Sequence, residues 1–133
     1  MVRNVLGVLA GMVVGGIANM AIVVVMMVIW PLPEGVALDD PEQMAAYTAT
    51  LPVAAWLMAV LAHLAQCFVG GGVAGRLGTH AMGAAVAVGA LSLIGGVMNL
   101  INLGAPGWMW AELPLYLVAA AAAGHLVGKD SAS

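Results

Sequence analysis

Two of the three histidines in this chain follow the same short pattern. In "LPVAAWLMAVLAHL" His63 lies eleven residues after Pro52, and in "LPLYLVAAAAAGHL" His125 lies eleven residues after Pro114. Eleven residues of α-helix rise about 16 Å. Both imidazoles are therefore expected in the middle of long helices, at matching depth.

Amide side chains extend this set. Asn19 lies eleven residues before Trp30, Asn99 lies eleven residues before Trp110, and Gln66 is about one helical turn beyond the first of the two histidines. We therefore predict a layer of uncharged polar side chains that face one another between helices. The predicted buried layer consists of Asn19, His63, Gln66, Asn99 and His125.

Two kinds of chemistry suit such a layer. Amides and neutral imidazoles hydrogen-bond across membrane helices and fix their register, each contributing about 0.6 kcal/mol. Alternatively, His63 and His125 could supply both axial ligands of a b-type haem, or each could hold the magnesium of a chlorophyll-type pigment. The structural interpretation needs no cofactor. The lone Cys67 gives no metal-binding spacing, so no separate metal site is expected.

Transport and catalysis have less support. An oligomer of this chain could pass a small solute along the polar layer without coupling. No Asp, Glu, Lys or Arg is expected inside a span, which disfavours proton-coupled or ion-coupled transport. The sequence shows no acid–base pair, no nucleophile beside a base and no phosphate-binding loop with its lysine, so we expect no enzymatic activity.

The elements that must position these residues are membrane-spanning helices. Of the 133 residues 64% are hydrophobic and 7% are charged, too few polar side chains to cover a water-soluble globule. About 20 apolar residues in a helix cross a bilayer. We predict one all-α membrane domain, residues 1–133, with spans at about 4–30, 51–76, 81–103 and 112–128 and a short extracytoplasmic interfacial helix within the outer loop 31–50.

The distribution of charge predicts the orientation. Arg3, Arg76 and Lys129 lie at the start, between the second and third spans, and after the fourth, whereas five of the six acids, Glu112 among them, fall in the other two loops. The positive-inside rule then places both termini in the cytoplasm, and the aromatic residues, including Tyr116, form a belt at the outer boundary. We expect a multi-pass protein of the bacterial cytoplasmic (inner) membrane that binds no nucleic acid.

An internal repeat accompanies these patterns. "GGIANM" at residues 15–20 resembles "GGVMNL" at 95–100, and the two proline–histidine segments repeat in step. We predict two similar hairpins, inserted the same way up and related by a pseudo-twofold axis along the membrane normal. Glycines spaced by four residues let such helices approach closely. The predicted packing positions are Gly7, Gly11, Gly15, Gly71, Gly75 and Gly95.

These features favour a non-catalytic role. A chain with almost no soluble mass and with small-residue helix faces is typical of an accessory or structural subunit of a larger membrane complex, or of a self-associating bundle. Its expected partners are the lipid bilayer and other transmembrane helices. Binding of haem or a chlorophyll-type pigment and uncoupled solute passage are the alternatives.

Overall fold

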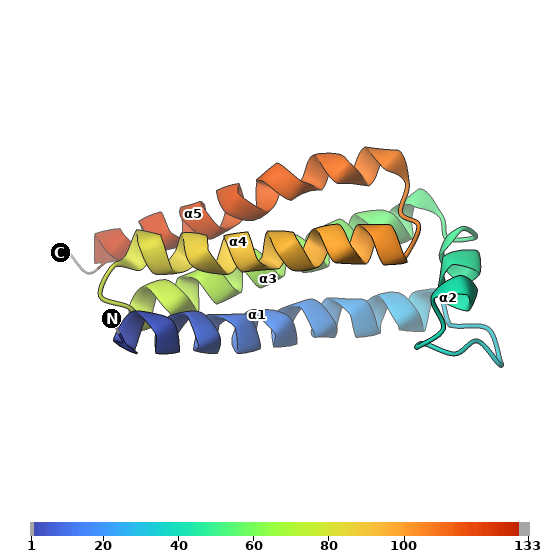
Figure 1. Ribbon diagram of the computed structural model, residues 1–133, viewed down its shortest axis with the longest axis horizontal. Coiled ribbons are helices and arrows are strands. Elements are labelled where there is room, and N and C mark those ends of the chain that lie inside the picture. Colours follow the sequence, from blue (N-terminus) through green and yellow to red (C-terminus); the bar gives the residue numbers. More distant parts are fainter. Residues whose placement is uncertain (1, 131–133) are drawn as a thin grey trace.

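The computed structural model describes residues 2–130, and within them the chain is entirely helical, as predicted. The four long helices lie side by side, and a short helix crosses one end of the bundle (Figure 1). We call this the α2 end, and the opposite one, where the N-terminus lies, the terminal end. The elements are α1 (Val2–Ile29), α2 (Pro41–Thr48), α3 (Val53–Leu77), α4 (Ala81–Asn102), the 3₁₀-helix η1 (Gly107–Glu112) and α5 (Leu113–Asp130).

Four segments of the described chain are long and apolar enough to cross a membrane, which confirms that part of the prediction. They are α1, α3, α4 and Gly107–Gly128, and the shortest has 22 residues. At 1.5 Å per residue even 22 residues exceed a hydrocarbon core of about 30 Å. Large aliphatic side chains cover the outside of the bundle, where lipid can solvate them.

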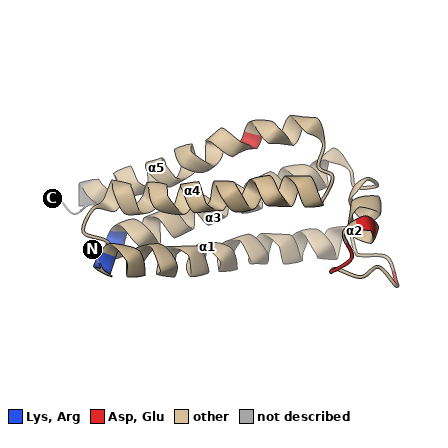
Figure 2. Cartoon of the chain, in the orientation of Figure 1, with Lys and Arg blue, Asp and Glu red and all other residues tan. Residues whose placement is uncertain are grey.

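Charged residues separate to the two ends of the bundle. Figure 2 shows the basic residues at the terminal end and most acidic residues around α2. At the terminal end the Arg3 side chain donates a hydrogen bond of 2.8 Å to the carbonyl of Leu77, which joins the start of α1 to the last turn of α3. The side chain of Lys129, the third basic residue, lies outside the described part of the structure.

α1 and α3 are in backbone contact through glycines. Gly7, Gly11 and Gly15 recur every four residues, are all buried, and face α3 as one stripe. A methyl group on Gly15 would lie 2.5 Å from the backbone oxygen of Gln66, and one on Gly11 would collide with the backbone oxygen of Gly70. Only glycine fits at these crossings, as expected of a small-residue packing face.

Two other predicted packing glycines also meet neighbouring backbone. A methyl group on Gly71 would lie 3.2 Å from Ala120 of α5, and one on Gly75 would lie 3.2 Å from the carbonyl oxygen of Ala81 at the start of α4. Both glycines are buried. α3 therefore packs closely on all three other long helices and forms the centre of the bundle.

The packing does not support two equivalent hairpins. Gly95, the counterpart of Gly15 in the predicted repeat, is exposed, and a methyl group there would meet no atom within 4 Å, so its assignment as a packing residue is wrong. The adjacent Gly96 faces α5 instead, against the ring of Tyr116. Neighbouring helix positions differ by about 100° of rotation, because one turn takes 3.6 residues. α4 therefore contacts α5 with a different face from the one that α1 turns toward α3.

The short helix α2 begins with a complete N-terminal cap. The Asp40 carboxylate accepts hydrogen bonds from the backbone N–H groups of Glu42 and Gln43, at 3.0 and 3.2 Å, and Pro41 occupies the first helical position. The bond from the Gln43 backbone favours the charged carboxylate and lowers the pKa of Asp40. This explains why a helix forms within the predicted outer loop.

Hydrogen bonds to both neighbouring helix ends fix α2 across the bundle. The Tyr47 hydroxyl donates to the carbonyl of Trp30 at 2.6 Å, and the Thr48 hydroxyl donates to the carbonyl of Leu103 at 2.8 Å. The first carbonyl directly follows α1 and the second directly follows α4. α2 therefore links the ends of two helices that touch each other only lightly along their length.

The light contact between α1 and α4 leaves space between them. Two hollows lie along this seam, a larger one of 490 Å³ toward α2 and another of 480 Å³ toward the terminal end, and Leu91 lines both. The bundle is thus closely packed between α1 and α3 and open between α1 and α4.

The α1–α3 contact gives a direct test of the fold. Gly11→Ala should lower the free energy of unfolding by about 1–3 kcal/mol, because the added methyl group must push the two backbones apart. Gly16→Ala is the matched control, since a methyl group there meets no atom within 4 Å. Equilibrium unfolding in mixed detergent micelles measures both variants. Equal stability of the two would contradict the contact.

Candidate functional site

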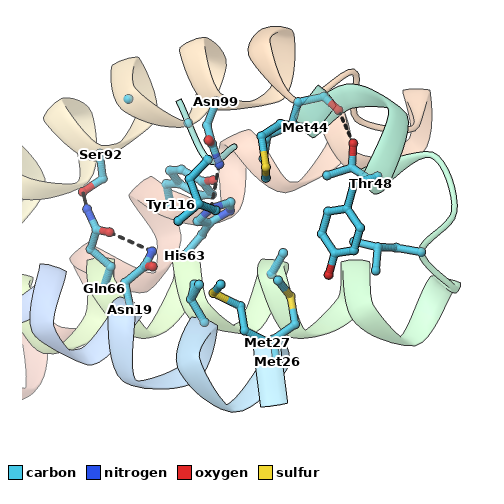
Figure 3. Close-up of a pocket in the computed structure, with 18 of the residues that line it drawn as sticks. Asn19, Met26, Met27, Met44, Thr48, His63, Gln66, Ser92, Asn99 and Tyr116 are labelled. Atoms are coloured by element: carbon cyan, nitrogen blue, oxygen red, sulfur yellow. Dashed lines mark hydrogen bonds between the residues drawn. The ribbon is translucent and has the colours of Figure 1, made fainter. Parts of the chain in front are cut away.

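The hollow toward α2 gathers most of the predicted polar layer. Asn19, His63, Gln66 and Asn99 all line this cavity of 490 Å³, although they come from three different helices (Figure 3). Residues of α2 and Tyr116 of α5 complete its wall. The structure thus brings together four of the five side chains predicted from the sequence.

The fifth, His125, lies elsewhere. Its side chain is exposed, whereas α5 turns Tyr116, Ala120 and Ala123 into the bundle. His125 follows Ala123 by two residues, about 200° around the helix, and so points away from the interior. Its assignment to the buried layer is wrong, and His63 and His125 do not meet in one cavity as a pair of axial ligands would. Spacing from Pro114 sets height along a helix but not the direction of the side chain.

An unexpected carboxylate lies behind His63. Glu112, assigned above to an outer loop, is only 3% exposed and falls inside the candidate span Gly107–Gly128. In Figure 2 one acidic segment is visible within the bundle, apart from the acids near α2. The expectation that no ionisable acidic or basic side chain lies inside a span is wrong, and with it the argument against ion-coupled transport.

The Glu112 carboxylate holds two ring-bearing side chains. Its Oε1 accepts a hydrogen bond of 2.8 Å from the Tyr116 hydroxyl and lies 3.0 Å from Nδ1 of His63. Tyr116 follows Glu112 by four residues and so lies on the same side of the helix that η1 leads into. The two rings lie 5.7 Å apart at an angle of 57°. Tyr116 is only 1% exposed, so its ring faces the interior of the bundle and not lipid.

The hydrogen bonds around His63 define its tautomer. The side-chain nitrogen of Asn99 lies 3.4 Å from Nε2 of His63, and an amide nitrogen can only donate. In the neutral ring, the tautomer that fits both contacts has its proton on Nδ1, donated to Glu112, and Nε2 as the acceptor. A carboxylate that fixes one imidazole nitrogen and leaves the other toward a cavity is the arrangement that orients histidines for ligand binding.

A second set of polar side chains spans three helices. The Asn19 amide of α1 donates to Oε1 of Gln66 in α3 at 2.9 Å, and the Gln66 amide donates to the Ser92 hydroxyl of α4 at 3.2 Å. Figure 3 shows this chain on one side of His63, toward the terminal end. It closes the polar end of the cavity and ties α1, α3 and α4 together.

The rest of the cavity is largely apolar and reaches the surface of the bundle. Figure 3 shows Met26 and Met27 of α1 facing Met44 of α2 across the hollow, on the other side of His63 from the amide chain. Leu91 and Gly95 of α4 also line it, and both are exposed on the outside of the bundle. The cavity therefore opens along the α1–α4 seam.

The site has no cluster of metal ligands. Among the described residues, no group of three or more His, Cys, Asp or Glu side chains could hold a metal ion. Cys67 is buried and has no disulfide partner in the described chain. The site can hydrogen-bond or ligate a cavity-bound molecule through one imidazole and a few amides.

Sequence reasoning missed three contributors, Glu112, Ser92 and Tyr116. A usable signal was present for two of them, since Glu112 and Tyr116 are spaced by four residues at the start of a helix marked by Pro114. Such spacing predicts that both side chains lie on the same face of the helix. If that face buries Tyr116, it buries Glu112 as well. Ser92 gave no comparable signal.

The buried carboxylate can be tested by substitution. Glu112→Ala leaves the His63 Nδ1–H and the Tyr116 hydroxyl without an acceptor and should lower the free energy of unfolding by about 2–5 kcal/mol. Glu112→Gln retains an acceptor oxygen and should cost less than half as much. Equilibrium unfolding in micelles compares the two. Similar, small losses for both variants would contradict the hydrogen bonds assigned to Oε1.

No protein-family model, no curated protein and no solved structure matches this chain.

Proposed function

We propose that this integral membrane protein binds a small amphipathic molecule in the cavity between α1 and α4. The observation that carries the proposal is the buried Glu112, which fixes His63 and leaves its Nε2 toward the cavity. A volume of 490 Å³ lies within the range of about 300–1,000 Å³ typical of ligand sites. A mostly apolar lining with a few oriented polar groups is also typical of such sites.

The opening of the cavity supports entry from the lipid phase. Its seam is bordered by the exposed, apolar Leu91 and by Gly95, and the α2 end is covered by Tyr47 and Thr48, which are held by hydrogen bonds. A molecule that is already dissolved in the bilayer reaches such a seam without crossing α2. The polar atoms of the ligand would then meet His63 and the amides, and its apolar part would lie along the methionines.

The distribution of charge supports the proposed orientation. Arg3 and Arg76 lie at the terminal end, so the positive-inside rule places that end in the cytoplasm of the bacterial cell in which we expect the protein. The α2 end then faces outward. In this orientation the cavity opens to the half of the bilayer farther from the cytoplasm.

Filling the cavity tests ligand binding. Gly95→Phe places a ring on a lining position where an added Cβ meets no atom within 4 Å, so it should occlude the cavity without disturbing the backbone. We expect protein purified from its native membrane to carry one defined amphipathic compound. The variant should retain about tenfold less of this compound, which corresponds to a loss of roughly 1.4 kcal/mol of binding free energy. Mass spectrometry of organic extracts measures the compound per mole of protein.

The matched control is Gly16→Phe. Gly16 is also unobstructed, but it does not line the cavity. It should retain the compound at the level of the unmodified protein. If the unmodified protein carries nothing beyond bulk lipid, or if both variants lose the compound equally, the proposed function is wrong.

An accessory-subunit role is a second candidate, favoured by the position of α1. In the most apolar 18-residue stretch of α1 only 6% of the residues are buried, whereas 28–39% are buried in the corresponding stretches of the other three candidate spans. α1 contacts mainly α3, so most of its surface, including Val13, Ile17 and Val24, is available to lipid or to helices of another protein. Such a helix suits docking to a larger membrane complex.

An accessory role predicts that the chain is extracted together with partner subunits. Native mass spectrometry after gentle extraction should then show an assembly larger than one chain. Ile17→Trp on α1 should dissociate it, whereas Val118→Trp on the equally exposed surface of α5 should not. A single chain without companions, or an assembly that tolerates Ile17→Trp, would argue against docking through α1.

A further inference from the structure

The chemical class of the ligand follows from the protons around His63, an inference that rests on the proposed function. Oε1 of Glu112 accepts hydrogen bonds from the Tyr116 hydroxyl and from Nδ1–H of His63. In the neutral imidazole, Nε2 then has a lone pair and no hydrogen. The only hydrogen bond that the described chain offers to this lone pair is the one of 3.4 Å from Asn99.

This hydrogen bond leaves the acceptor poorly satisfied. An N–H donor normally lies 2.7–3.2 Å from its acceptor, so the Asn99 contact is long. The hydrogen bond from Nδ1–H to the Glu112 carboxylate polarises the ring toward Nε2, which strengthens Nε2 as an acceptor. The side chain of His63 is 14% exposed, and it lines the cavity. A ligand that brings an O–H group to Nε2 gains a bond that the protein itself does not supply well.

The walls beyond His63 suit an aromatic ring. Met26, Met27 and Met44 converge on the hollow next to the imidazole (Figure 3). Thioether sulfurs make favourable contacts with aromatic rings, and flexible methionines adapt to a flat ligand. The Tyr116 ring, tilted against His63, adds an aromatic side to the same cavity.

The geometry points to a phenol-type ligand. Its ring hydroxyl donates to Nε2 of His63 and its oxygen accepts from the Asn99 amide, which can turn from the ring nitrogen to the ligand. The aromatic ring lies among the methionines, and an apolar tail leaves through the α1–α4 seam into lipid. A hydroxyl on an aromatic ring is a stronger hydrogen-bond donor than an aliphatic alcohol. Nε2 of His63 should therefore bind a phenol more tightly than an aliphatic alcohol.

Three matched probes test this class. 4-Octylphenol, 4-octylanisole and 4-octylcyclohexanol have the same tail, but the anisole has no donor and the cyclohexanol has no aromatic ring. Binding to the protein in lipid nanodiscs is measured by equilibrium dialysis, with empty nanodiscs subtracted. The phenol should bind about 3- to 10-fold more tightly than the anisole, the value of one net hydrogen bond, and more tightly than the cyclohexanol.

The variants assign the donor bond to His63. In Glu112→Gln, which keeps an acceptor for Nδ1–H but removes the negative charge, the preference for phenol over anisole should weaken without disappearing. The double variant His63→Phe/Glu112→Gln removes Nε2 without leaving an unpaired buried carboxylate. In this variant the phenol and the anisole should bind about equally. A readout on the unmodified protein does not depend on folding of variants. The nitrogen-15 resonance of His63 Nε2 should shift on addition of the phenol, while Nδ1 stays protonated.

The outcomes separate this inference from the proposed function. If phenol and anisole bind equally to the unmodified protein and Gly95→Phe abolishes both, the cavity binds ligands but the donor assignment is wrong. It is also wrong if the preference survives in the double variant, or if a haem or pigment band shows that His63 ligates a metal. If none of the probes binds and no compound is co-purified, the proposed function itself fails.

Discussion

The site depends on the burial of one carboxylate in the apolar bundle. Moving an ionisable side chain from water into a membrane protein costs several kcal/mol unless hydrogen bonds replace its solvation. Glu112 receives that replacement at one oxygen, from Tyr116 and His63, while Oε2 has no hydrogen-bond partner in the described chain. Loss of either donor would leave the carboxylate poorly solvated. The same bonds fix the imidazole, so the requirement to solvate Glu112 also determines which nitrogen of His63 faces the cavity.

Tight and loose helix contacts divide the bundle between stability and binding. The glycines of α1 bring its backbone against α3, so van der Waals contact is extensive on that side. α1 contacts α4 much less closely than it contacts α3. The cavity lies along the weaker contact, and α2 keeps its end closed through Tyr47 and Thr48. A closely packed α1–α3 pair beside a loose α1–α4 seam would let the proposed ligand enter without unpacking the core.

Composition and hydropathy predicted the helices because membrane spans need long apolar segments, and the small-residue stripe of α1 predicted its packing face because glycine spacing is a one-helix property. Relations between helices were harder to predict. His63 and His125 share the same spacing from a proline, but only the rotation of each helix decides which one faces inward, and that rotation depends on neighbours far away in sequence. The charge of Glu112 predicts a residue in the outer loop, although Glu112 directly precedes an apolar segment. Its burial also needs the donor from His63, 49 residues away, which no local pattern reports.

The polar residues differ in how many of their hydrogen-bonding groups have a partner within the protein. This difference distinguishes a structural role from the proposed binding role. Gln66 uses both ends of its amide, accepting from Asn19 and donating to Ser92, so these three side chains join α1, α3 and α4. They fit the structural interpretation of a polar layer. His63 is different, since its Nδ1 is fully engaged while its Nε2 has only the long contact to Asn99. The bond at Nδ1 solvates Glu112 and so serves the fold, whereas an incompletely bonded acceptor at Nε2 adds nothing to it. The state of Nε2 is therefore the feature that supports a bound molecule.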